Sequence, residues 1–277
     1  MIDIAEGPTK AKALDLNQAG AILGYDTKIK GSSEFEDLKD SDLVIISAGK
    51  PREPGMDRMD LIRSNREIVS SCMKHLKEYC PKAIVIIVTN PLDVMCYVAY
   101  KEADFKREKL FGMAGILDTS RFRTFLSWET GVSKSKIEAW VLGGHGNQMV
   151  PVLEHTKVDG KPVRELVGKE KLEKIVGRTR KGGGEIVSLL GKGSAYYAPG
   201  ASIVEMIEAI LLDQNKILPV SVYLQGEYGY QDVFLGVPVK LGKGGSEKIV
   251  EFELEEETKK MLDESVKEVQ RGIESLD

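Results

Sequence analysis

The sequence of 277 residues is poor in the residue types that hold metals and disulfide bonds. It has only three cysteines, Cys72, Cys80 and Cys96, and none of them follows the Cys-x-x-Cys spacing. An odd number of cysteines without that spacing predicts reduced, structural thiols of a cytoplasmic protein. The three histidines are far apart in the sequence, so we expect no metal site.

Long apolar runs and clusters of one charge are also missing. No apolar stretch approaches the roughly 18 residues that a membrane span needs, and the first residues lack the features of a signal peptide. The formal net charge is −4 and the basic residues are dispersed, which excludes the concentrated basic surface of a nucleic-acid-binding protein. We therefore expect neither a membrane nor a nucleic acid as partner.

The first half of the chain alternates apolar runs with helical patterns. Residues 42–47 and 83–88 are continuous apolar runs, typical of strands buried on both faces of a parallel sheet, and residues 2–4 are a shorter one. Helical periodicity covers residues 8–24, 59–78, 92–103 and a segment from 118 to 128. This alternation predicts an α/β fold with a doubly wound parallel sheet, in which ligands bind at the carboxyl ends of the strands.

The pattern changes after about residue 135 and predicts an α+β arrangement that caps the first half. The last expected helix is amphipathic, with apolar residues along one face. The expected helices cover residues 170–190, 201–213 and 255–276, and the expected strands cover residues 136–142, 149–158, 217–225, 232–241 and 249–253.

Polar residues suited to dicarboxylate chemistry follow the predicted strand ends. Arg52 and Arg58 share a loop with two prolines and two glycines, and Asp118 and Arg121 lie at i and i+3 on one helix face. A guanidinium binds a carboxylate through a planar fork of two donors. His145, between glycines, is suited to proton transfer near neutral pH, and a buried aspartate would favour its charged form.

Each of these residues also has an ordinary structural explanation. An arginine is most often a solvated charge, a lone histidine in a glycine loop is most often a turn residue, and an Asp–Arg pair that opens a helix is a common terminal ion pair. Their order along the chain, at the ends of successive predicted strands, favours a site that binds a dicarboxylate and moves a proton.

Five motifs resemble the lactate/malate dehydrogenase family, in particular its malate dehydrogenases of the lactate-dehydrogenase-like type. They cover residues 46–58, 88–95, 115–123, 143–147 and 193–202. The resemblance implies a Rossmann-like NAD-binding domain over residues 1–117 and an α+β catalytic domain over residues 118–277. It further implies NAD-dependent, reversible oxidation of (S)-malate to oxaloacetate by a homodimer or homotetramer.

The resemblance also implies the roles of five residues in the reaction. His145 takes the hydroxyl proton of malate, and Asp118 orients this histidine and stabilises its imidazolium. Arg121 matches the arginine that binds the carboxylate next to the reacting carbon. Arg58 matches the mobile-loop arginine that polarises the substrate oxygen, and Asn90 matches the asparagine that hydrogen-bonds that oxygen and borders the nicotinamide.

Further residues match the family's specificity and cofactor positions. Arg52 stands where malate dehydrogenases have arginine and lactate dehydrogenases have glutamine, so it implies preference for a second carboxylate. Asp3 matches the acidic residue that holds the ribose hydroxyls, which favours NAD over NADP. Asn65, with the backbone around Val88 and Thr89, is expected to line the cofactor.

The N-terminus departs from the family pattern. The family's first strand, its Gly-x-Gly-x-x-Gly turn and its first helix would precede Asp3 by roughly 25–30 residues. We therefore expect an N-terminally truncated domain, the loss of one pairing partner by each of the strands at residues 2–4 and 42–47, and weak or no dinucleotide binding. The alternatives are a dehydrogenase of lactate or another 2-hydroxy acid, and an inactive member that binds dicarboxylates or assembles with full-length subunits.

Overall fold

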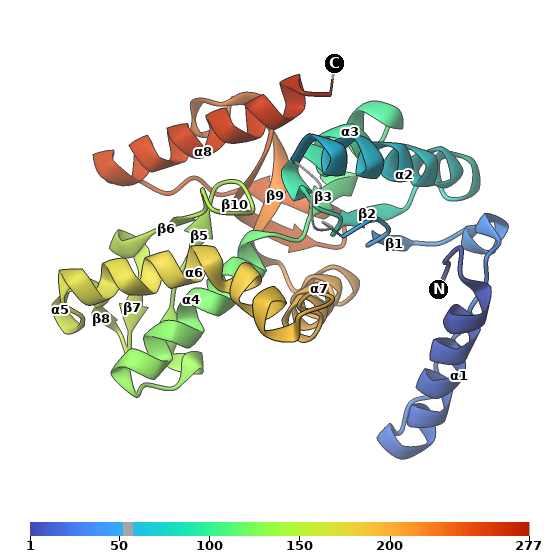
Figure 1. The fold of residues 1–277 in the computed structure, drawn as a ribbon, viewed down its shortest axis with the longest axis horizontal. Coiled ribbons are helices and arrows are strands. Elements are labelled where there is room, and N and C mark those ends of the chain that lie inside the picture. Colours follow the sequence, from blue (N-terminus) through green and yellow to red (C-terminus); the bar gives the residue numbers. More distant parts are fainter. Residues whose placement is uncertain (52–57, 277) are drawn as a thin grey trace.

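A computed structural model shows three parallel strands at one end of a larger mixed sheet (Figure 1). It describes residues 1–51 and 58–276, and of Arg58 the main chain only. The parallel strands are β1 (Leu43–Ile46), β2 (Ile84–Ile87) and β3 (Leu110–Gly112), and the helices between them are α2 (Arg58–Tyr79) and α3 (Leu92–Glu102). Strand β2 is buried along its whole length, as its continuous apolar sequence predicts. The predicted α/β class is confirmed.

Three antiparallel strands continue the same sheet. They are β9 (Lys216–Gln225), β10 (Gln231–Gly242) and β11 (Gly245–Ile249), and the order across the sheet is β1-β2-β3-β9-β10-β11. The join between the two halves is the pairing of Gly112 in β3 with Ser221 in β9. One sheet therefore extends across the expected domain boundary at residue 117, and the division into two domains stays a prediction.

Some predicted strands of the second half were wrong in extent. Residues 136–142 hold two short strands, β4 (Ile137–Glu138) and β5 (Val141–Leu142), and residues 149–158 hold two more, β6 (Val150–Pro151) and β7 (Lys157–Val158). Strand β4 pairs with β7, β5 pairs with β6, and β8 (Lys161–Pro162) pairs with β7. A 3₁₀ helix at Leu153–His155 interrupts the second segment. The last strand begins at Gly245, because a tight glycine turn pairs Gly242 directly with Gly245, whose φ is +99°.

Helices cover both faces of the mixed sheet and bury its apolar strands. Those of the second half are α4 (Gly115–Thr130), α5 (Val163–Leu166), α6 (Lys169–Leu190), α7 (Tyr197–Leu211) and α8 (Glu256–Glu274). Helix α8 turns Leu262, Val266 and Val269 toward the core, as its amphipathic sequence predicts. Further 3₁₀ helices cover Phe35–Leu38, Arg107–Lys109, Lys134–Lys136 and Glu227–Gly229.

The N-terminal helix α1 (Glu6–Leu23) projects away from the mixed sheet (Figure 1). The strand expected at residues 2–4 is reduced to one bridge between Ile2 and Ser32, and β1 pairs with β2 alone among the described strands. Ile22 and Leu23 on α1 are largely exposed. Throughout the described residues, no helix combines the length and the apolar character needed to cross a membrane.

Candidate active site

Two helical residues and one loop residue form a largely buried charged cluster beyond β3. Asp118 and Arg121 lie in the first two turns of α4, which follows β3, and His145 lies in the loop after β5. One oxygen of the Asp118 carboxylate lies 2.8 Å from Nδ1 of His145, and the other accepts a hydrogen bond of 2.9 Å from Nη1 of Arg121. The i, i+3 spacing on the helix brings Asp118 and Arg121 together, as the sequence predicts.

Asp118 sets both the orientation and the proton affinity of His145. A donor at Nδ1 bound to the carboxylate leaves Nε2 as the acceptor of the neutral ring. Burial lowers the pKa of His145, but the charge and hydrogen bond of Asp118 raise it, so that the pKa lies above the ordinary histidine value. The charge of Arg121 opposes this rise. The arrangement suits a histidine that both accepts and donates a proton near neutral pH.

The loop that carries His145 needs its glycines. Gly143 has a φ of +87°, and a Cβ there would lie 2.7 Å from Oγ of Ser265 in α8. A Cβ on Gly144 would lie 2.7 Å from a methyl carbon of Val269, also in α8. Both distances are shorter than side chains permit, so the glycines let the loop lie directly on α8 and hold the histidine close to Asp118.

Arg121 lies under two glycines of α6. A Cβ on Gly182 would lie 3.1 Å from Cδ of Arg121, and one on Gly183 would lie 3.3 Å from a guanidinium nitrogen. Among the described residues, Arg121 donates to Asp118 alone, which uses one of its five N–H donors. The small residues of α6 leave space around a fork that can bind a carboxylate.

Several predicted cofactor residues meet at the carboxyl ends of β1 and β2. The hydroxyl of Thr89 donates to the carbonyl of Ala48 over 2.6 Å. The amide of Asn65 accepts from the N–H of Lys50 at 2.7 Å and donates to the carbonyl of Asn90 at 2.7 Å. Asn65 therefore connects two strand-end loops through its side chain, while Val88 is half-buried and packs against the core.

The resemblance places the nicotinamide side of NAD at this strand-end region, and this placement stays a prediction. Gly49 lies at the end of β1, where a Cβ would come within 2.6 Å of Thr89 and 3.2 Å of Asn65. The glycine therefore lets the two strand-end loops pack against each other at the carboxyl ends of the parallel strands, which is where ligands bind in this fold class. Asn65, Thr89 and Asn90 are the residues that would hold the nicotinamide half.

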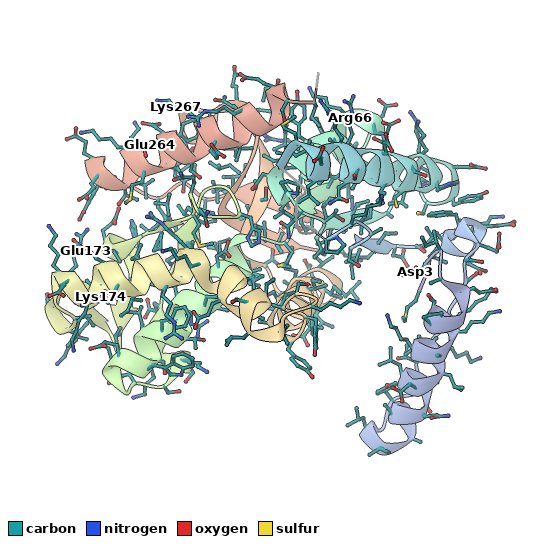
Figure 2. All side chains as sticks on the ribbon, viewed as in Figure 1. Asp3, Arg66, Glu173, Lys174, Glu264 and Lys267 are labelled. Carbon is teal, nitrogen blue, oxygen red and sulfur yellow. The ribbon has the colours of Figure 1, made fainter. Side chains whose placement is uncertain are left out.

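Asp3 lies apart from the charged cluster. Figure 2 shows it on the N-terminal segment beside α1, where its carboxylate accepts a hydrogen bond of 2.9 Å from the N–H of Ala5. The structure gives no contact between Asp3 and the other predicted cofactor residues. Arg52 and the side chain of Arg58 lie outside the described residues, so their predicted roles stay predictions.

Three functional candidates were missed by the sequence prediction. Asp93, Ser221 and Ser265 are buried polar residues that hold the histidine loop and its support. Ser221 carried a signal, because it interrupts an apolar strand sequence between two valines. Asp93 follows the Asn90-Pro91 pair at a strand end, which is the position from which other site residues were predicted.

The fold and the cluster define the class of this protein before any comparison. A parallel sheet with an Asp–His pair and an arginine beyond its strand ends suits an α/β enzyme that binds an anionic ligand at the strand ends and moves a proton. Comparison with known proteins narrows this class. Residues 1–112 match the lactate/malate dehydrogenase NAD binding domain, and residues 116–276 match the lactate/malate dehydrogenase alpha/beta C-terminal domain. The chain belongs to the lactate/malate dehydrogenase family.

Individual relatives agree with this assignment. A malate dehydrogenase of Bacillus cytotoxicus is 52% identical over 278 aligned positions, which cover all of this chain and 89% of the relative. The malate dehydrogenase structure of Cryptosporidium parvum superposes with a TM-score of 0.96 at 42% identity, covering all of this chain and 90% of the other. A lactate dehydrogenase of the same organism, complexed with lactic acid and NAD, has a TM-score of 0.96 at 40% identity, covering all of this chain and 89% of the other. The predicted family and the NAD-dependent enzyme class are confirmed.

Proposed function

We propose that this chain interconverts (S)-malate and oxaloacetate with NAD as the redox partner. The observation that carries the proposal is the bridge of Asp118 between His145 and Arg121, since one carboxylate places a proton acceptor beside a carboxylate-binding fork. The similarity to proteins named malate dehydrogenase, at about half identity over the whole chain, supports the same substrate.

The residues divide the work of the oxidation between them. Arg121 binds the carboxylate next to the reacting carbon, and Asn90 donates to the substrate oxygen. Nε2 of His145 takes the hydroxyl proton as the C–H bond breaks, and Asp118 stabilises the imidazolium that forms. NAD, when bound, accepts the hydride. Arg58 polarises the same oxygen in this proposal, from the loop that we expect to fold over the site.

The second carboxylate is assigned to Arg52. A closed site that buries this guanidinium would leave it unpaired with pyruvate, which costs far more than a missing methylene group. This disfavours the alternative of a lactate dehydrogenase, although lactate dehydrogenase structures superpose equally well. Fold similarity alone does not choose between these substrates, because the difference rests on one side chain.

The reaction is tested by following NADH oxidation with oxaloacetate and with pyruvate. The assay should cover a wide range of NADH concentration. We expect oxaloacetate to be the faster substrate and His145→Gln to reduce the rate at least about a hundredfold. A faster reaction with pyruvate would overturn the substrate, and no reaction with any 2-oxo acid would favour the inactive binding protein.

We further propose that the chain forms a homo-oligomer in the cytoplasm, with no nucleic acid, membrane or metal as partner. Support for the oligomer is the exposed apolar stripe along α7, at Tyr197, Val204 and Leu211. Support for the compartment is that its three cysteines are free.

A further inference from the structure

Three consecutive N–H groups anchor the backbone of the loop that carries His145 to three different elements. The N–H of Gly143 donates to a carbonyl of β10 over 2.8 Å. The N–H of Gly144 donates to Oγ of Ser265 in α8 over 2.8 Å. The N–H of His145 donates to Oδ2 of Asp93 in α3 over 2.7 Å. The last of these three acceptors is the charged one, and it binds the histidine itself.

Asp93 is a buried carboxylate with both oxygens occupied. Its Oδ1 accepts a hydrogen bond of 2.7 Å from Oγ of Ser221, a fully buried residue of β9. An ionised carboxylate accepts hydrogen bonds at both oxygens, and here each oxygen has one donor, Ser221 or the N–H of His145. Burial of an ion without such partners would be strongly unfavourable. These two donors, the hydroxyl of Ser221 and the N–H of His145, therefore stabilise the ionised form of Asp93 in the core.

We propose that Asp93 is a positioning residue for His145: its carboxylate fixes the backbone of the histidine and adds a second negative charge that helps the ring hold its proton. The effect of Asp93 on the rate of turnover rests on the proposed function. The geometry itself does not, since it is a direct contact between Asp93 and the backbone of His145. The partners lie 52 positions apart in the chain, and folding alone brings them together.

The charges around the ring agree with this role. Asp118 and Arg121 face His145 from α4, and Asp93 faces it from α3, where its charge raises the pKa of the histidine. Burial raises the pKa of Asp93 above the ordinary aspartate value, and the hydrogen bonds from Ser221 and from the backbone of His145 only partly oppose this rise. The neighbouring thiol of Cys96 stays neutral, because burial raises its pKa well above the ordinary value.

The direct test is an NMR titration of the histidine rings in the whole chain. The sequence has three histidines, so His75 and His155 serve as internal references and His145→Gln assigns the third signal. Asp93→Asn keeps the shape, an acceptor for the His145 N–H and a group that can bond Ser221, but it removes the charge. We expect the titration midpoint of His145 to move to lower pH, with both references unchanged. An unchanged midpoint in folded Asp93→Asn would overturn the electrostatic part of the proposal.

Ser265→Ala is the matched control. It removes the neighbouring anchor at Gly144 without changing any charge, so the midpoint of His145 should stay at the wild-type value. Asp93→Ala removes charge and acceptor together. If the backbone contact matters, Asp93→Ala should lower kcat for oxaloacetate reduction about tenfold below Asp93→Asn, with KM little changed. Equal kcat values in these two variants would overturn the anchoring part.

Ser221→Ala keeps the proposal testable if Asp93→Ala does not fold. It removes one of the two donors that stabilise the Asp93 carboxylate, so we expect the midpoint of His145 to move to lower pH by less than in Asp93→Asn, and kcat to fall roughly threefold. An unchanged kcat would also count against anchoring. A shifted midpoint in a chain without activity would refute the proposed function alone, whereas activity with an unshifted midpoint would refute the role of Asp93 alone.

Discussion

At the residue scale, one carboxylate links the two parts of the proposed chemistry. Asp118 bonds the imidazole of His145 with one oxygen and the guanidinium of Arg121 with the other. Burial of the ring lowers the pKa of His145, but the charge and the hydrogen bond of Asp118 together outweigh it and raise that pKa. The protonated ring that oxaloacetate reduction needs therefore persists to higher pH than an ordinary histidine would allow, and reduction should decline as pH rises through that raised pKa.

Asp118→Asn should expose this dependence. The variant keeps the size of the side chain but removes the charge that favours the imidazolium, so we expect kcat/KM for oxaloacetate to fall about a hundredfold or more. The alkaline decline of the reduction rate should also move to lower pH. Rate measurements across pH test both effects, and Asp159→Asn, which alters an exposed ion pair with Lys136, is the control. A variant with wild-type rates at all pH values would exclude the role of Asp118.

Arg52→Gln tests substrate choice at a single residue. Glutamine cannot pair with the distal carboxylate of oxaloacetate, so the ratio of kcat/KM values should move toward pyruvate by at least about a hundredfold. Lysine at the same position is the control for charge without the planar fork, and we expect intermediate behaviour. An unchanged ratio in Arg52→Gln would show that other residues set the specificity.

The sequence predicted the residues of this site better than their supports. Asp118 and Arg121 were predictable as neighbours, since helical spacing places i and i+3 on one face. His145 was predictable as part of the same site, because its loop and α4 both follow strands of the predicted pattern. The contact between Asp93 and His145 was not predictable from local patterns, because it depends on how α3 packs against a loop 52 positions away.

At the element scale, the packing of α6 on α4 shapes the space around Arg121. Gly182 and Gly183 bring the helix backbone against the guanidinium, so that even one methyl group would meet it. A Cβ on Gly184, the next residue, would point into open space, with no neighbouring group within 4 Å. Adjacent glycines on one helix thus differ in their relation to the site.

Substituting each glycine by alanine separates helix stability from the site. Both Gly183→Ala and Gly184→Ala should raise the stability of α6, by about 0.5–1 kcal/mol each, because alanine favours the helix. Gly183→Ala should also displace the guanidinium and raise KM for oxaloacetate roughly tenfold, whereas Gly184→Ala should leave it unchanged. Thermal unfolding and steady-state kinetics measure the two effects. Equal KM values in both variants would contradict the assigned role of Gly183.

Short elements were the part of the fold that the sequence predicted least well. Long apolar runs such as those of β2 and β9 were found because burial on both faces needs continuous apolar sequence. Strands β5 and β6 have only two residues each and pair with each other, although their segments were predicted as longer strands. Apolar side chains there pack into the core from irregular backbone, so apolar sequence alone did not mark where pairing stops.

At the scale of the whole molecule, helix α7 carries apolar surface that no other described element covers. Helix α7 turns Met206, Ala209 and Ile210 into the core, yet Tyr197 and Leu211 on its other side are exposed. A helix with apolar residues on both sides usually has a second packing partner. In the proposed homo-oligomer, that partner is a second copy of the chain.

Val204→Glu should therefore weaken the oligomer without disturbing the fold. Tyr197, Val204 and Leu211 follow one another every seven residues and are 82%, 52% and 62% exposed, so they form one stripe along α7. A carboxylate in the middle of a buried apolar contact between copies would lose its hydration, and we expect sedimentation equilibrium to show a shift toward the monomer.

The matched control is Lys267→Glu, which adds negative charge on the outer side of α8 (Figure 2). In sedimentation equilibrium, Lys267→Glu should give the same molar mass of the oligomer as the wild-type chain. Both variants should keep the circular dichroism of the folded chain. If Val204→Glu retained the oligomer, the contact would have to use another surface. A wild-type chain that is monomeric at all concentrations would refute the proposed assembly, because the stripe would then remain exposed to water in the working protein.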